Sequence, residues 1–275
     1  MHEPIPPERF HELIRAVYEG RYQNSRAAER FGATIEDWDV SQVTDMSAAF
    51  QHWKTFDADL SRWDVSHVTT MEGMFAGARA FNHPLESWDV SRVQTMRFMF
   101  GGAESFDQPL RGWNVGRVRD MSAMFYNAHA FNASLAGWNT GQVTDMSDMF
   151  HDAHAFNQPL EGWDVSAVVD MTRMFCNARA FNQPLEGWNI AQVLIMDCMF
   201  HHAYTFNQPL ERWDVGRVEH MTRMFSHARA FNQPLERWDV LRVVEADEMF
   251  DGARSFNQNG WTAKQPLPRL RMRGL

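Results

Sequence analysis

Residues 81–105 read FNHPLESWDVSRVQTMRFMFGGAES, and this pattern of 25 residues returns along most of the chain. A phenylalanine follows each repeated tryptophan by twelve residues, from Phe50 to Phe250, and a second one follows by eighteen, from Phe56 to Phe256. A fixed period of this length is typical of stacked repeat architectures. The sequence therefore predicts one elongated solenoid rather than two globular domains. The nine tryptophans in register are Trp38, Trp63, Trp88, Trp113, Trp138, Trp163, Trp188, Trp213 and Trp238.

Each unit combines two kinds of apolar spacing. Residues 88–90, Trp–Asp–Val, alternate apolar, polar and apolar, as a short strand does. From Met96, apolar residues recur three, four and seven positions further on, which is helical spacing and predicts an α or 3-10 segment over residues 93–103. The predicted fold class is an α/β solenoid of nine coils, resembling leucine-rich repeats, with short parallel strands on the inner curve and short helices opposite.

The unbroken register indicates that the aromatic residues form the interior of the stack. Full burial of such a side chain stabilises a fold by about 1.5–3 kcal/mol. The residues predicted to form the structural core are Trp63, Trp88, Trp113, Trp138, Trp163, Trp188, Trp213, Trp238, Phe100, Phe125, Phe150 and Phe175.

The chain divides into three parts. Residues 1–30 are expected to form an N-terminal helical cap, with one amphipathic helix beginning near Phe10 and a second capped by Ser25. A separate binding helix is the alternative for this part. Residues 31–257 form the nine-repeat solenoid, and residues 258–275 are expected to form a C-terminal cap and basic tail.

Composition argues against several classes of protein. The formal net charge of −9 disfavours nucleic-acid binding, which needs a basic surface. Two cysteines, Cys176 and Cys198, are too few for a disulfide framework, although one disulfide between adjacent coils stays an alternative. With no secretory signal and no run of about 20 apolar residues, we expect no membrane span and a cytoplasmic protein. No catalytic motif is present, so we expect neither an enzyme nor a cofactor.

Two polar columns are candidates for metal binding. An Asp or Asn follows each tryptophan and offers one ligand per coil, unlike the dense oxygen loops of calcium sites. His129 and His154 stand one period apart, whereas zinc needs three or four converging ligands. We expect no metal site, and hydrogen bonds to turns are the expected role of the Asp row.

The position before each tryptophan predicts a binding surface. Four consecutive units have glycine there, which would leave a strip without side chains on the inner face, with arginine towards both ends. A protein partner's extended segment would lie on this strip; the alternative is that glycine relieves crowding on a curved sheet. The predicted partner-binding residues are Arg62, Gly112, Gly137, Asn139, Gly162, Gly187, Arg212 and Arg237.

Residues 39–46 and 163–181 match nearly residue for residue the repeat W-D-[VT]-S-x-V-T-x-M-x-x-M-F-x-x-A-x-x-F-N-x-x-L. Over about residues 24–258 the chain therefore resembles the BspA-like leucine-rich repeat family, in its 25-residue "surface protein repeat" branch. The resemblance implies a right-handed solenoid and adhesion or protein contacts at a cell surface. It brings no catalytic residues. From this sequence we expect no signal sequence, lipobox cysteine or wall anchor, and in this the chain departs from that family.

These observations predict a non-enzymatic repeat scaffold for protein–protein recognition through its curved sheet face, adhesion included. The alternative is an architectural subunit that self-associates into a larger particle, layer or filament. The expected location is cytoplasmic from the sequence, and cell-surface or particle-associated from the resemblance.

Overall fold

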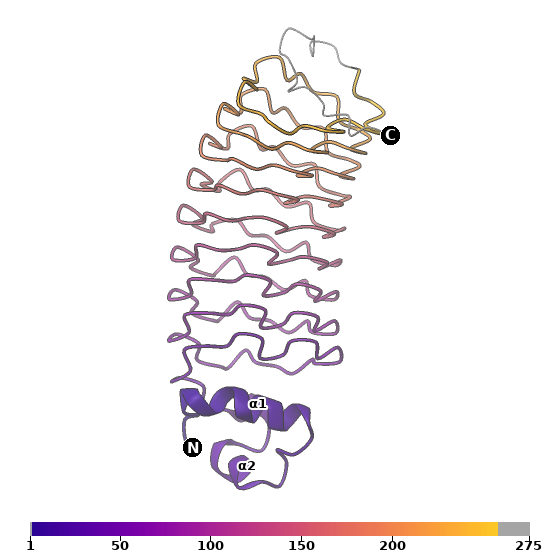
Figure 1. Cartoon of the computed structure of the whole chain (residues 1–275). Helices are drawn as coiled ribbons and strands as arrows, with labels where there is room; N and C mark the ends of the chain where they lie inside the picture. Colours follow the sequence, from indigo (N-terminus) through magenta and orange to yellow (C-terminus); the bar gives the residue numbers. More distant parts are fainter. Residues whose placement is uncertain (1, 258–275) are drawn as a thin grey trace.

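The structure, a computed structural model, describes residues 2–257 and shows a long stack of coils with helices at its N-terminal end (Figure 1). The chain is a repeat solenoid, as predicted. Within the described range, helices precede the repeats, and they are η1 (Pro7–Arg9), α1 (Phe10–Tyr18), α2 (Arg26–Phe31) and η2 (Ile35–Asp37). The predicted C-terminal cap and basic tail lie outside the described residues.

The helices α1 and α2 cover the first coil. The Phe10 ring is fully buried and meets the rings of Trp38 and Trp63 edge-on, with centroids 6.5 and 6.0 Å away. The hydroxyl oxygen of Ser25 accepts a hydrogen bond from the Ala28 amide at 3.2 Å and caps α2. The aromatic column of the solenoid therefore continues into α1 instead of ending at solvent.

The coils are built from turns, and the predictions of a strand over residues 88–90 and a helix over residues 93–103 are both wrong. Between residues 38 and 257, no strand and no α-helix is present in the coils. The backbone bonds between coils lie where the helix was predicted. Phe98 N–H donates to the Ser122 carbonyl at 2.9 Å, and Phe100 N–H donates to the Met124 carbonyl at 2.9 Å. We call residues 95–102 and their equivalents the ladder segment.

Alternate amides in the ladder segment bond locally, as in turns. Met99 N–H donates to the Met96 carbonyl at 3.1 Å, three residues back. Each coil also has two residues with positive φ, which at Phe98 is 55° and at Gly102 is 72°. Successive four-residue turns bury every third or fourth side chain, so they give the apolar spacing that predicts a helix.

The second of these positions has a composition that indicates turns. Glycine has no steric penalty at positive φ, and Asn, Asp and His are enriched there. Every residue at this position belongs to that group: His52, Gly77, Gly102, Asn127, Asp152, Asn177, His202, His227 and Gly252.

The aromatic columns occupy the interior. The nine tryptophans are 1–5% exposed, and Phe100, Phe125, Phe150 and Phe175 are fully buried. From Trp63 onward, each indole N–H donates to a carbonyl 28 residues earlier, for example Trp188 to Leu160 at 3.0 Å. These bonds satisfy buried polar groups that no regular strand pairs.

The stack is tighter on the side of the ladder segment. Ring centroids of Phe75 and Phe100, just behind the ladder, lie 5.5 Å apart, whereas those of Trp113 and Trp138 lie 6.4 Å apart. Equivalent groups in successive coils report the local rise, which is about 4.8 Å for hydrogen-bonded backbones. The ladder segment therefore lies on the inner curve of the stack. The tryptophan side lies on the outer curve, although the sequence predicted a sheet there on the inner curve.

Candidate functional site

The four glycines before the tryptophans form a column in exposed turns on the outer side. A Cβ at Gly137, Gly162 or Gly187 would meet no atom within 4 Å, whereas one at Gly112 would lie 3.3 Å from Glu86 Cγ. Crowding therefore does not explain three of the four glycines. Their role in binding stays a prediction.

The arginines expected at both ends of this column form ion pairs with acids of the preceding coil. Arg212 lies 3.4 Å from Glu186, Arg237 lies 3.3 Å from Glu211, and Arg62 lies 3.8 Å from Asp37. Side chains engaged in this way are already partly neutralised. The structure does not bring the arginines together, because several coils separate Arg62 from the other two.

The Asp and Asn row after the tryptophans closes local turns. The carboxylate of Asp89 accepts the Ser91 amide at 3.0 Å, and the bonds from the Ser91 hydroxyl and amide lower the pKa of Asp89. Asn139 likewise accepts the Gly141 amide at 3.3 Å. Within residues 2–257, no group of three or more His, Cys, Asp or Glu side chains could hold a metal ion.

Side chains on the inner side vary from coil to coil. We define the ladder face as the residues that stand 9, 10, 13, 14 and 16 positions after each tryptophan. Across the nine coils these positions hold small, aromatic, acidic and basic residues, while the core positions repeat almost unchanged. A varied surface on the concave side of a constant interior is where repeat proteins can present specific contacts.

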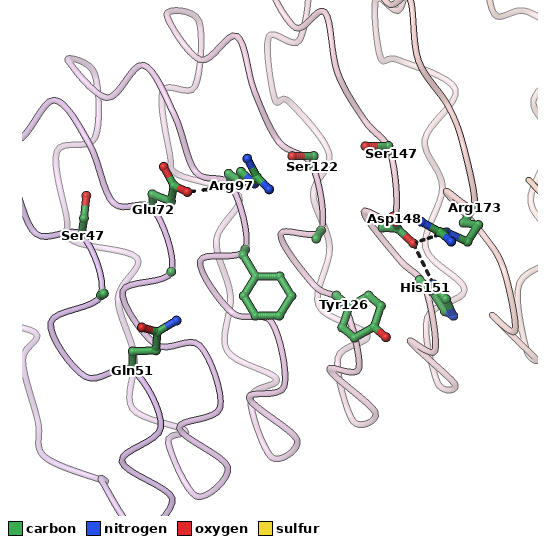
Figure 2. Close-up of a pocket in the computed structure, with 14 residues that line it drawn as sticks. Ser47, Gln51, Glu72, Arg97, Ser122, Tyr126, Ser147, Asp148, His151 and Arg173 are labelled. Atoms are coloured by element: carbon green, nitrogen blue, oxygen red, sulfur yellow. Dashed lines mark hydrogen bonds and ion pairs between the residues drawn. The ribbon is translucent and has the colours of Figure 1, made fainter. Parts of the chain in front are cut away.

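A groove of about 650 Å³ crosses the ladder face over the first six coils (Figure 2). The ring centroids of Phe98 and Tyr126 in it are 5.7 Å apart, and Tyr126 meets the ring of His151 edge-on at 4.8 Å. Ser122 and Ala123 provide a floor of small side chains. The groove thus offers a row of aromatic groups on three consecutive coils.

Phe98 combines strain with partial exposure. Its φ of 55° is a genuine outlier for a bulky residue. Its ring lies over Gly101, where a Cβ would come within 2.7 Å of the ring carbons. Other coils place Ala123 or Gly73 at the same position, so the stack does not require an aromatic there. The turn imposes a positive φ at this position in every coil, and at Phe98 the coil carries a bulky, half-exposed ring there.

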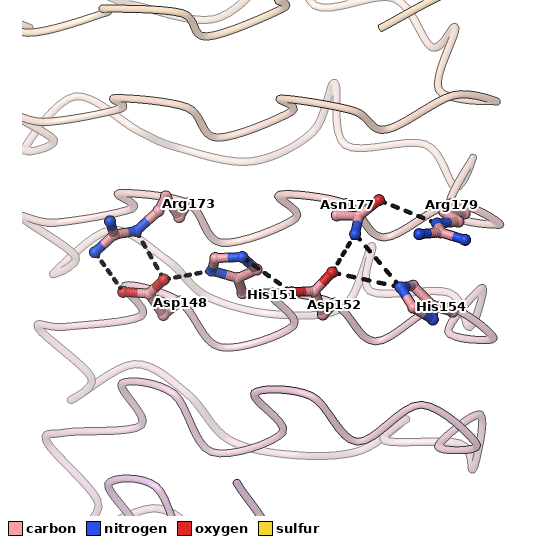
Figure 3. A network of polar contacts seen from close by, with 7 residues as sticks. All are labelled: Asp148, His151, Asp152, His154, Arg173, Asn177 and Arg179. Atoms are coloured by element: carbon pink, nitrogen blue, oxygen red, sulfur yellow. Dashed lines mark hydrogen bonds and ion pairs between the residues drawn. The ribbon is translucent and has the colours of Figure 1, made fainter. Parts of the chain in front are cut away.

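A polar network borders the C-terminal end of the groove (Figure 3). The ring nitrogens of His151 donate to Asp148 at 2.8 Å and to Asp152 at 3.2 Å, and Arg173 also binds Asp148 at 2.8 Å. Burial alone would lower the pKa of His151, but the hydrogen bonds to the two carboxylates outweigh it and raise that pKa to about 12. His151 is therefore a fixed cation whose two nitrogens are both engaged.

The structure thus places a candidate site on a face that the sequence prediction missed. Phe98, Tyr126 and His151 were not among the predicted binding residues, because their segment was interpreted as a helix. The variation at their positions from coil to coil was the available signal.

Comparisons with known proteins concern the whole repeat. No helix among residues 2–257 has the length and apolar character needed to cross a membrane. No curated protein matches the chain. Among solved structures, the chain is similar to a leucine-rich repeat protein from Bacteroides ovatus ATCC 8483, with 9% identity over 76% of this chain and 79% of that one. The TM-score is 0.23, a likeness too weak to carry an argument.

The family described as "Mycoplasma protein of unknown function, DUF285" matches residues 21–135, 110–204 and 185–265. These matches overlap and together extend from α2 to the last coil. The chain belongs to this DUF285 repeat family.

Proposed function

We propose that the chain is a non-enzymatic repeat scaffold that recognises another protein through its ladder face. The single observation that carries the proposal is the groove, in which the exposed edges of Phe98 and Tyr126 line a concave surface that changes from coil to coil. Aromatic side chains in concave, partly dry positions dominate the energy of protein interfaces. The resemblance to the BspA-like branch supports protein contact, with adhesion as one form of it.

The polar groups beside the groove support recognition over catalysis. A general base needs a free nitrogen near neutral pH. Both nitrogens of His151 bind carboxylates, and the neighbouring Cys176 side chain is 5% exposed. We therefore assign these groups to shaping and charging the surface.

The experiment compares two faces of the solenoid in a capture assay. The Phe98→Ala, Tyr126→Ala double variant removes the aromatic row, and both replacements have precedents in the repeats at Ala123 and Ala76. The Gly162→Arg variant fills the glycine column at a position where an added Cβ meets no atom within 4 Å. Immobilised proteins capture partners from a cell extract, and the captured protein is then purified and titrated.

The groove variant should weaken binding by about 30-fold, the effect of losing roughly 2 kcal/mol at a hot spot. The Gly162→Arg variant should bind like wild type. Unchanged binding by the groove variant would contradict the proposal, and loss in Gly162→Arg alone would move the site to the glycine column. Circular dichroism melts confirm that both variants are folded.

A further inference from the structure

Charge on the ladder face differs from charge elsewhere on the protein. Its 45 positions carry eight Lys or Arg and eight Asp or Glu, so the formal charge of −9 lies on the other surfaces. Seven of the twelve histidines also stand on this face. They are His52, His129, His151, His154, His201, His202 and His227.

Two arginines on the C-terminal half of this face are held by neutral groups. Arg179 donates to the Asn177 side-chain oxygen at 3.1 Å, and the Arg229 guanidinium lies 4.5 Å from the centre of the Tyr204 ring. Neither has a carboxylate within 4 Å among residues 2–257, whereas Arg79, at the same position of an earlier coil, pairs with Glu104 at 3.2 Å. The charges of Arg179 and Arg229 are therefore oriented without being neutralised.

Stacked histidine pairs flank these arginines. The rings of His129 and His154 are parallel within 4° at 4.7 Å, and those of His202 and His227 are parallel within 10° at 4.6 Å. Stacked neutral imidazoles leave N–H groups at their edges. A positive charge on His154 or His202 would favour an anion beside the pair.

The charged and polar groups around the histidine pairs come from the same coil and from neighbouring coils. Asp152 lies 3.4 Å from His154, and Asp251 lies 3.8 Å from His227. Asp152 is already bound by His151 and Asn177, so it neutralises His154 weakly. The remaining groups that face the pairs or act on their charge are Glu104, His151, Arg179, His201, Tyr204, Arg223 and Arg229.

We infer that the face formed by His129, His154, Arg179, His202, His227 and Arg229 binds an acidic, extended segment of the partner protein, and binds it more tightly at mildly acidic pH. The inference rests on the proposed function, since this histidine–arginine face begins on the coils of Tyr126 and His151 in the groove and extends to later coils. Arg179 and Arg229 are two coils apart, or roughly 10 Å, and three residues of an extended chain span about the same distance. Carboxylates on such a segment can reach both guanidiniums.

Acid pH strengthens this face through its histidines. Burial, Arg179 and His129 lower the pKa of His154, and burial, His227 and Arg229 lower the pKa of His202. A bound carboxylate favours the protonated form, so anion binding and proton uptake support each other as the pH falls below the ordinary histidine pKa.

The test is a fluorescence anisotropy titration of the full chain with a fluorescein-labelled peptide of eight aspartates, at pH 7.5 and pH 5.5. Aspartate stays ionised at both values. We expect about tenfold tighter binding at pH 5.5. The Arg179→Ser, Arg229→Ser variant should lose binding, and the matched Lys54→Ser, Arg79→Ser variant, at the same positions of earlier coils, should keep it.

The His202→Asn, His227→Asn variant is a second probe, because Asn127 and Asn177 occupy the same position in other coils. Its gain in affinity between pH 7.5 and pH 5.5 should be smaller than that of wild type, since only the His129–His154 pair remains. Binding that is independent of pH in wild type, or equal losses in the two arginine variants, would overturn the inference. Tighter binding of a sulfated oligosaccharide or an oligonucleotide than of the aspartate peptide would also overturn it. If wild type does not bind the peptide, but the groove variant still binds the captured partner more weakly than wild type does, the inference fails and the proposed function stands.

Discussion

The indole N–H groups of the tryptophans pair the carbonyls that close each coil. Trp188 donates to Leu160, while Trp38 in the first coil has no such carbonyl acceptor among residues 2–257. We predict that Trp188→Phe lowers the free energy of unfolding by about 1–3 kcal/mol more than Trp38→Phe does, because it leaves a buried carbonyl unpaired. Urea denaturation of both variants measures the difference. Equal losses would show that volume, and not the hydrogen bond, matters.

Positive φ at a residue with a Cβ is a local cost. Ala123 has a φ of 54°, and glycine stands at the same position as Gly73, with a φ of 60°. Ala123→Gly should therefore stabilise the fold, and Gly73→Ala should destabilise it, each by about 1 kcal/mol. A Cβ at Gly73 would meet only ordinary contacts of 3.8 Å, so the pair isolates backbone strain. Thermal melts that move in the same direction for both variants would contradict this account.

Histidine titration gives the stability a defined pH dependence. Burial, then the nearby His202 and His227, lower the pKa of His201 to about 4. In the unfolded chain His201 protonates near pH 6.5, so its contribution is complete above that value and is lost as the pH falls towards 4. When the pH is lowered from 7 to 4.5, the melting temperature of His201→Gln should fall less than that of wild type. Parallel curves for the two proteins would contradict the assignment.

His151 contributes to stability with the opposite sign. Its folded pKa of about 12 lies above its ordinary value, so its contribution is complete below pH 6.5 and is lost as the pH rises through 12. Burial would raise the pKa of Asp152, but its bonds with His151 and Asn177 lower it to about 2. Its contribution to stability is therefore complete above its ordinary pKa and is lost as the pH falls towards 2. The network beside the groove therefore persists at mildly acidic pH, where the histidine–arginine face gains charge.

A column of asparagine side chains, one per coil, links the turns of successive coils. The Asn157 side-chain oxygen accepts the Asn182 amide at 2.9 Å and the Gln183 side chain at 3.0 Å. We predict that Asn157→Ala costs about 1–3 kcal/mol, since it leaves these donors unpaired. Asn157→Asp should cost less, because Asp107 plays the same part for Asn132 at 2.8 Å. The comparison uses urea denaturation, and equal losses would contradict the role of the acceptor.

At the scale of the coil, the sequence predicts the interior better than the backbone. The period and the burial of the tryptophan and phenylalanine columns follow from the register, because these aromatic residues return at the same positions in every coil. The ladder segment could not be assigned from apolar spacing, since turns and helices share the spacing of Met96, Met99 and Phe100. Asn127 and Gly102 gave the better signal, because both suit positive φ.

The two faces of the whole molecule follow from its curvature. The sequence placed the sheet, and with it the glycine strip, on the inner curve, whereas the shorter rise lies at the ladder. A difference of less than 1 Å per coil between the phenylalanine and tryptophan columns decides the direction of the bend, and no single residue encodes it. The groove and the histidine–arginine face share the ladder face, so one extended partner can contact both.

The position of the ladder segment is tested most directly by amide hydrogen exchange resolved to single residues in the intact protein. The Phe98 and Phe100 amides, which donate to the next coil, should exchange slowly. The Asp89 and Val90 amides have no acceptor among the described residues and should exchange faster. Slow exchange at Asp89 and Val90 with fast exchange at Phe98 and Phe100 would place the inter-coil bonds beside the tryptophans, and would contradict the assignment of the binding face.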